Sequence, residues 1–283
     1  MLNANRSMKS LSKIAVLDRF APLRTRLLTI LGELSEDDWA RPTAAPRWSV
    51  KDVTAHLLGG DIGILSRERD FFTPLGPKVE TYSDLVNLID MLNQEWTAAA
   101  RRMSPRLLRE LLEFLGPGVE AYFSSLDAEA MGGPVSWAGP DPAPVWFDIA
   151  REFTERWHHQ QQIRDATGRP PLYDPYFLSP VLDTFVRALP HNFRRTAASE
   201  GTIVRFEISG DAGGIWSLLR SGRRWELRLG SGTEPSVDVV VPQDMAWRMF
   251  TKGVDPETAR TTALVRGDAR LASPIFHTVS VIG

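Results

Sequence analysis

The sequence predicts an all-α N-terminal domain, a four-helix bundle, followed by a smaller α+β domain. Up to about residue 170, apolar residues recur at intervals of three and four, which is the spacing of one helical face. After residue 200, short β-rich runs are separated by Gly or Pro. A chain of 283 residues is also longer than one typical domain. We therefore expect a helical domain with its connecting helix over 1–200 and an α+β domain over 201–283.

Helix boundaries in the first domain are predicted from capping residues. Ser49 is followed three residues later by Asp52, which is close to a capping box and marks a helix start. Ser104-Pro105 is a favoured pair for the cap and the first helical position. Gly168 is placed to end a helix, and the Gly- and Pro-rich residues 127–144 predict a loop. The expected helices span about 12–34, 49–72, 82–103, from 104 onward, 145–167 and 174–198.

The second domain is predicted as a mostly antiparallel sheet with accompanying helices. Ser221-Gly222 is a plausible hairpin turn. The glycine-rich segment 210–214 lacks the phosphate-binding pattern and precedes no helix, so it predicts a turn between strands. The expected strands lie at about 202–208, 216–219, 225–229 and 237–241, and the expected helices at 243–252 and 268–279.

Composition excludes several classes of function. The net charge is −2 with 24% charged residues, so the sequence shows no basic surface for nucleic acid or an anionic membrane. No apolar stretch approaches the roughly 18 residues of a membrane helix, and no secretory signal is evident, so we expect a cytoplasmic protein. The chain has no cysteine, which excludes thiolate ligands and a cysteine nucleophile. It also lacks the G-x-S-x-G elbow of serine hydrolases.

Three polar residues predict a metal site. Glu155 and His159 lie four apart on one predicted helix, so their side chains share a face one turn apart. His56 lies in the middle of another helix, and two ligands from one helix with one from a second is a common design in bundles. Carboxylate oxygen and imidazole nitrogen both bind divalent metals. Three glycines within 59–63 indicate either close helix packing or space for a ligand beside His56.

Other interpretations of these residues remain open at this point. His158 lies three residues after Glu155, a spacing that bundle metal sites also use, so it competes with His159. The helical wheel places Glu155 and His159 opposite the apolar face, which predicts that they face water unless the helix is buried all round. His191, in a predicted loop, and His277 are interpreted as structural or solvent-facing.

Two motifs resemble those of a known family. Residues 48–57, WSVKDVTAHL, resemble the W-[ST]-x-x-[DE]-[VL]-x-x-H-[LI] signature of the DinB-like superfamily. Residues 155–168, ERWHHQQQIRDATG, resemble the E-x-x-x-H-x-x-D-[LI]-x-x-A-x-G stretch of its mycothiol-dependent maleylpyruvate isomerase branch. The segment that begins at Asn93, followed by Ser104-Pro105, also fits that branch, and the order of elements after residue 200 resembles its sterol-carrier-like domain.

The resemblance implies a ligand set. It places His56 on the first histidine, Glu155 on the carboxylate, and His159 rather than His158 on the second histidine. It also implies that the stripe of Glu155 and His159 faces the bundle interior, against the wheel. The sequence departs from the family where Gln162 replaces the aspartate that follows the second histidine, an acid that could orient a metal ligand.

The resemblance further implies a metal-dependent enzyme that uses a mycothiol-type thiol on a small electrophilic substrate such as maleylpyruvate, with zinc as the expected metal. The expected outcome is isomerisation or S-transfer. The C-terminal domain of the family contributes a basic residue to the site, for which Lys252, Arg248 and Arg266 are candidates. The alternatives are a non-enzymatic protein that binds metal and an apolar ligand, and a hydrolase that activates water on the metal.

Overall fold

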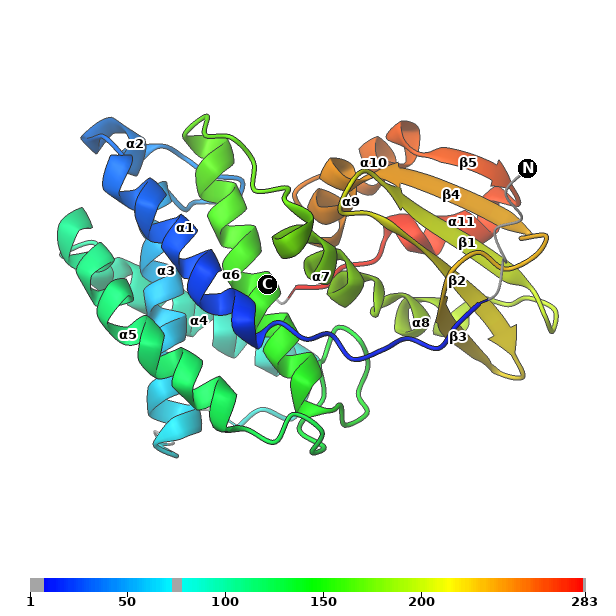
Figure 1. Cartoon of the computed structure of the whole chain (residues 1–283), viewed down its shortest axis with the longest axis horizontal. Helices are drawn as coiled ribbons and strands as arrows, with labels where there is room; N and C mark the ends of the chain where they lie inside the picture. Colours follow the sequence, from blue (N-terminus) through cyan, green and yellow to red (C-terminus); the bar gives the residue numbers. More distant parts are fainter. Residues whose placement is uncertain (1–7, 73–77, 282–283) are drawn as a thin grey trace. The chain divides into compact units, whose positions relative to one another are not determined.

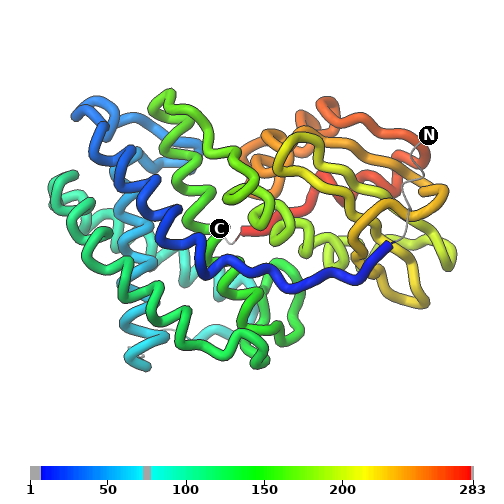
Figure 2. The backbone as a smooth tube through the Cα atoms, in the orientation of Figure 1, coloured from blue at the N-terminus to red at the C-terminus, as the bar shows by residue number. Residues whose placement is uncertain are grey.

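The computed structural model describes residues 8–72 and 78–281 (Figures 1 and 2). Residues 1–7 lie outside the described part. They belong to the N-terminal stretch in which the sequence shows no secretory signal. The chain divides into two compact units. The helical unit comprises 15–130 and 152–172, and the sheet unit comprises the segment up to 14 together with 131–151 and 173–281. The predicted fold class, helices followed by an α+β region, is confirmed.

The predicted boundary at residue 200 concerns which parts of the chain fold independently, and it stays a prediction. In the described structure, residues 131–151 and the connecting helix after 173 group with the sheet rather than with the bundle. One long helix, α6, therefore contributes to both units, and its residues from Glu152 onward belong to the helical unit.

The helical unit is built from long helices that lie alongside one another (Figure 1). Its shared core is a cluster of buried aliphatic side chains that includes Leu27, Val53, Leu58, Leu108 and Leu112. These side chains recur at helical spacing on their elements, as the sequence periodicity indicates. The elements are η1 (Leu17–Arg19), α1 (Phe20–Glu33), α2 (Glu36–Ala40), α3 (Val50–Gly63), η2 (Ile64–Arg69), α4 (Tyr82–Ala100), α5 (Pro105–Ser125) and α6 (Val145–Ala166).

Both predicted helix starts are confirmed. The Ser49 hydroxyl accepts from the Asp52 backbone N–H at 3.3 Å, and the Asp52 carboxylate accepts from the Ser49 N–H at 3.0 Å. At the start of α5, the Ser104 hydroxyl accepts from the Leu107 N–H at 3.2 Å, with Pro105 at the first helical position. These contacts satisfy N–H groups that the first turn of a helix leaves without partners. They fix where α3 begins, and thereby where His56 lies.

Several boundaries were predicted wrongly. The first helix starts at Phe20 after a 3-10 turn rather than near residue 12, and the buried Ile14 and Val16 precede this turn in a segment without helical structure. The α-helical part of the second helix ends at Gly63 and continues as a π-helical turn to Arg69. The short helix α2 was missed, although Ser35 and Asp38 form a full capping box around the acidic run.

The sheet unit contains a five-stranded sheet in the order β3-β2-β1-β4-β5. β1 pairs in parallel with β4, and the other described pairings are antiparallel, so the mostly antiparallel prediction is confirmed. The strands are β1 (Ile203–Ser209), β2 (Gly214–Ser221), β3 (Arg224–Leu229), β4 (Val237–Pro242) and β5 (Leu264–Gly267), and the helices are α7 (Pro175–Val186), α8 (Leu189–Asn192), η3 (Phe193–Arg195), α9 (Gln243–Phe250), α10 (Pro256–Thr262) and α11 (Ala269–Phe276).

The core of the sheet unit forms where helices pack against alternating side chains of the sheet. Phe206 on β1 and Phe185 on α7 both pack against Phe250 on α9, with ring centroids 6.3 and 5.7 Å away. The predicted turn at 210–214 is confirmed, and the hairpin turn lies at Gly222-Arg223, one residue beyond the predicted Ser221-Gly222. Strand β5 and helix α10 were missed because they are short, and His191 lies in helix α8 rather than in a loop. Within 8–72 and 78–281, no helix is long and apolar enough to cross a bilayer.

Candidate metal centre

The three residues predicted as metal ligands come together inside the helical unit. His56 projects from α3, and Glu155 and His159 project from successive turns of α6. One carboxylate oxygen, Glu155 Oε1, lies 3.0 Å from His56 Nε2 and 2.9 Å from His159 Nε2. The three potential ligand atoms all lie within 4.8 Å of one another. The geometry therefore allows one ion to contact all three, although the assignment of metal ligands stays a prediction.

The helical-wheel prediction that Glu155 and His159 face water is wrong for His159. Only 6% of His159 is exposed, and the α6 residues from Trp157 to Arg164 are all buried. The buried glutamines of this stretch have hydrogen-bond partners; the Gln160 amide, for example, donates to the Leu23 carbonyl at 3.2 Å. A wheel that assumes one wet face fails for a helix enclosed on every side. The side chain of Glu155 remains one-third exposed, so the site is accessible.

Each candidate histidine is also held at its second ring nitrogen. His56 Nδ1 lies 3.2 Å from the amide oxygen of Asn93 on α4, and His159 Nδ1 lies 2.9 Å from the amide oxygen of Gln162 on α6. Because an amide oxygen only accepts hydrogen bonds, each of these contacts is a hydrogen bond when the proton is on Nδ1. The sequence analysis noted that Gln162 replaces an acid that could orient a metal ligand, but it did not connect Asn93 to His56. The available signals were the Asn93 segment in the family resemblance and the departure at Gln162.

The charge on Glu155 is set by its neighbours. Burial acts to raise the pKa of Glu155, but the charge and hydrogen bond of His159, with a hydrogen bond from His56, hold this pKa well below its usual range. The carboxylate is therefore ionised. His158 behaves differently, because burial and the neighbouring His159 lower its pKa to about 3, so it is neutral.

His158 does not join the cluster of ligand atoms. Its Nδ1 lies 3.9 Å from Glu155 Oε2, which is beyond hydrogen-bond distance, and has no hydrogen-bond partner among the described residues. Its ring lies against that of His159, with centroids 4.0 Å apart. The structure therefore brings His159 rather than His158 to the other two candidates.

Aromatic side chains support the site from two directions. The Trp48 ring lies 4.8 Å from the His56 ring and 6.4 Å from the His159 ring, measured between centroids. On another side of α3, the Trp96 N–H donates to the Ala55 carbonyl at 2.7 Å. A Cβ at Gly59 would approach the Trp96 ring to 2.6 Å, so this glycine is required for close packing of α3 on α4.

The helical bundle and the three side chains that converge within it define the class of protein. It is a helical-bundle protein with a candidate His–Glu–His metal centre. The family model for the mycothiol maleylpyruvate isomerase N-terminal domain matches residues 20–164, just over half of the 283-residue chain. The chain therefore belongs to the mycothiol maleylpyruvate isomerase family.

Solved structures agree with this fold. A crystal structure of the mycothiol-dependent maleylpyruvate isomerase is similar with a TM-score of 0.52 and 12% identity, over 82% of this chain and 86% of that one. A mutant of that enzyme gives a TM-score of 0.51 and 11% identity over the same shares of the two chains. At this identity the likeness concerns the fold alone. A search of curated proteins finds no match to this chain.

Proposed function

We propose that this protein is a metal-dependent enzyme that uses a mycothiol-type thiol on a small electrophilic substrate such as maleylpyruvate, with isomerisation as the outcome. Family membership supports the thiol and the substrate class. The convergence of His56, Glu155 and His159 on one point supports the metal, and it is the observation that carries the proposal.

The number of protons that the two histidine rings can carry supports a cation at this site. Both ring nitrogens of His56 and of His159 face an oxygen that accepts, but a neutral imidazole has one N–H and satisfies one acceptor. In neutral rings whose Nδ1 protons point at the amides, two Nε2 lone pairs and a Glu155 oxygen would face one another, whereas a proton on Nε2 would donate to Glu155. A divalent cation among these atoms would replace that repulsion with three attractive contacts.

Distances support the same conclusion. Zinc binds imidazole nitrogen and carboxylate oxygen at about 2.0–2.2 Å, so tetrahedral donors lie roughly 3.3 Å apart. Glu155 Oε1 now lies 3.0 and 2.9 Å from the two Nε2 atoms. These two distances would lengthen by a few tenths of an ångström to admit the ion, and rotation about side-chain bonds would adjust the distance between the two histidine nitrogens, which lies within 4.8 Å. Zinc is the metal we propose, because three protein ligands that leave one open position are typical of its catalytic sites.

The charge of the site favours an anionic fourth ligand. Ionised Glu155 and two neutral imidazoles would leave one net positive charge on a divalent ion. A bound metal supplies Lewis-acid chemistry, which deprotonates a coordinated thiol and makes it a nucleophile. The chain has no cysteine, so the thiol must be external. The neutral His158 adds no competing charge beside the site.

A turnover assay with and without thiol tests the proposal. The purified holoprotein should isomerise maleylpyruvate only when mycothiol is added, and Glu155→Gln should lose this activity because an amide is a poorer ligand than a carboxylate. Equal turnover of an electrophile or ester without thiol would favour activation of water instead. No turnover with metal bound, under any thiol, would favour the non-enzymatic binding protein.

A further inference from the structure

The amides of Asn93 and Gln162 hold the two candidate ligands from opposite sides. Asn93 belongs to α4 and contacts a histidine on α3, whereas Gln162 lies one turn beyond its histidine on α6. In both contacts an amide oxygen faces Nδ1 of the ring. The other ring nitrogen, Nε2, is the one that faces Glu155. Amide oxygens on two helices thus approach the same ring nitrogen, Nδ1, in both histidines.

We propose that Asn93 and Gln162 are positioning residues that fix the metal-binding tautomer of both histidines, and that their neutrality makes the site select an anionic ligand. This inference rests on the proposed function. Ligating histidines commonly donate their other N–H to a carboxylate or a carbonyl, which orients the ring. An amide orients the ring in the same way but adds no negative charge. Each carboxylate in its place would cancel one positive charge near the metal.

Burial predicts that the amides of Asn93 and Gln162 contribute unequally to the orientation of the two histidine rings. Gln162 is 7% exposed and His159 is 6% exposed, so water cannot readily replace that hydrogen bond. Asn93 and His56 are only half-buried, and their contact is longer. An unsatisfied buried N–H costs more than one that reaches water. Gln162 should therefore be the stronger positioning residue.

Replacement of Gln162 separates orientation from charge. Gln162→Met keeps the bulk of the side chain and removes the acceptor, so the dissociation constant for Zn²⁺, measured by competition with a chelating dye, should rise roughly 10–100-fold. Gln162→Glu keeps an acceptor and adds a charge. It should keep metal affinity but weaken the binding of thiocyanate to the Co²⁺-substituted protein by roughly tenfold or more.

The neighbouring Gln161 offers a matched control. It is also buried, but its amide oxygen accepts from the Leu172 N–H at 2.9 Å and its amide donates to Asp165 at 3.2 Å, so it contacts neither histidine. Gln161→Met should lower the melting temperature and leave the Zn²⁺ dissociation constant within about threefold of the parent. Melting curves of the metal-free variants show whether each one folds.

A measurement on the metal-free protein tests the tautomer independently of the proposed function. At about pH 8, where an ordinary histidine is neutral, ¹⁵N NMR of the metal-free protein should show His159 protonated at Nδ1. In Gln162→Met the proton should move to Nε2, towards Glu155. An Nε2-protonated ring in the parent, or unchanged Zn²⁺ affinity in Gln162→Met, would overturn the positioning role. Unchanged thiocyanate affinity in Gln162→Glu would overturn the charge argument. A parent that binds no metal refutes the proposed function and the selection of an anionic ligand, while the NMR result still decides the tautomer.

Discussion

Helices α3 and α6 carry two polar clusters that differ in one respect. In the candidate metal centre, Glu155 Oε1 lies between the Nε2 atoms of His56 and His159, which carry a charge only when the rings are protonated. In the second cluster, Arg156, which directly follows Glu155 on α6, donates to Asp61 on α3 and to Glu152 on α6, both at 2.7 Å. We call this second group, Asp61, Glu152 and Arg156, the paired cluster.

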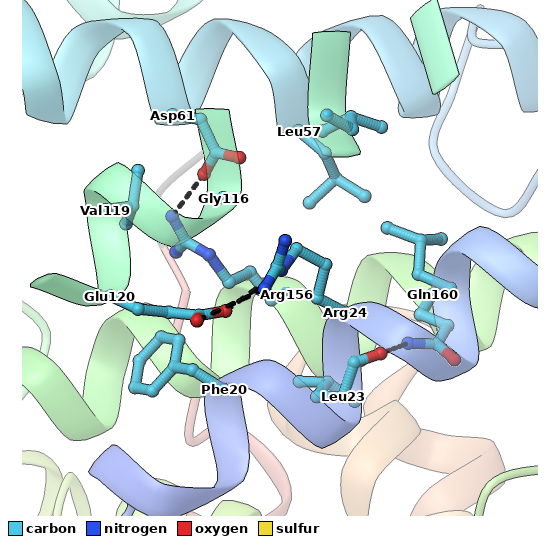
Figure 3. A pocket seen from close by; sticks show the side chains of 12 residues that line it. Phe20, Leu23, Arg24, Leu57, Asp61, Gly116, Val119, Glu120, Arg156 and Gln160 are labelled. Atoms are coloured by element: carbon cyan, nitrogen blue, oxygen red, sulfur yellow. Dashed lines mark hydrogen bonds and ion pairs between the residues drawn. The ribbon is translucent and has the colours of Figure 1, made fainter. Parts of the chain in front are cut away.

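The paired cluster is complete without a ligand. It borders a pocket in which Arg24 forms a second ion pair with Glu120, and Figure 3 shows both pairs across it. The Arg156 guanidinium also lies 5.6 Å from the centre of the Phe20 ring, within range of a cation–π contact. Every charge in this pocket has an opposite partner. In the metal centre the partners of Glu155 are two histidines, which are charged only when protonated, and a bound cation could take the place of those protons. This difference marks the metal centre as the site that can take a cation.

Arg156→Met should produce the largest change in stability. The substitution leaves Asp61 and Glu152 buried without their cation, which costs about 3–5 kcal/mol of unfolding free energy. Denaturant unfolding of the metal-free protein measures it. A triple variant with Asp61→Asn and Glu152→Gln as well should recover much of the loss. If Arg156→Met were as stable as the parent, the paired cluster would have no structural role.

Glu155→Gln should have the opposite effect to Arg156→Met, with a large loss of metal affinity and a smaller loss of stability. Metal affinity should fall by roughly 100-fold or more, about 2.7 kcal/mol, because removal of a ligand exceeds the effect of residues outside the ligand set. The unfolding free energy of the metal-free protein should change less than in Arg156→Met. Competition titration and denaturant unfolding on the same samples measure both. A variant that lost stability but kept metal would reverse the roles of the two clusters.

A smaller effect is expected where α3 begins, since this position sets the place of both clusters. Burial acts to raise the pKa of Asp52, but hydrogen bonds from Arg101 and Ser49, together with the charge of Arg101, lower it below its usual value. Its stabilisation is therefore present above the unfolded pKa of about 3.9 and is lost as the pH falls through the folded value. Asp52→Asn should cost about 1 kcal/mol at neutral pH and progressively less as the solution is acidified below about pH 4.

The control for this prediction is Asp84→Asn in the exposed capping box of α4. It should cost less than Asp52→Asn at neutral pH, because solvent competes for the exposed contacts. Denaturant unfolding over a pH series measures both variants. A loss in Asp52→Asn that did not depend on pH would show that its charge is irrelevant.

His158→Ala should have the smallest effect on the metal centre. His158 is neutral, and its Nδ1 lies 3.9 Å from Glu155. The dissociation constant for Zn²⁺ should stay within about threefold of the parent, although loss of a buried ring lowers stability. Competition titration measures the affinity. Loss of metal in this variant, at parent-like folding, would place His158 in the ligand set.

Much of the fold was predictable because its signals are local. Ser49, Ser104 and the β-rich runs after residue 200 each fix an element through neighbouring residues. The ligand candidates were predictable in part, since Glu155 and His159 share a helical face. Their burial was not, because it depends on helices that are distant in the sequence and pack around α6, such as α1, where the Leu23 carbonyl accepts from Gln160. Asn93 was missed as a partner of His56 for the same reason, as the two lie 37 residues apart.

Metal content of the purified protein tests the central claim most directly. The wild type should carry about one divalent ion per chain, zinc by preference, and His159→Ala should lose it while circular dichroism shows that the helices persist. His158→Ala should keep the ion. A wild type that takes up no ion after exposure to excess Zn²⁺, or a folded His159→Ala with full occupancy, would contradict the account.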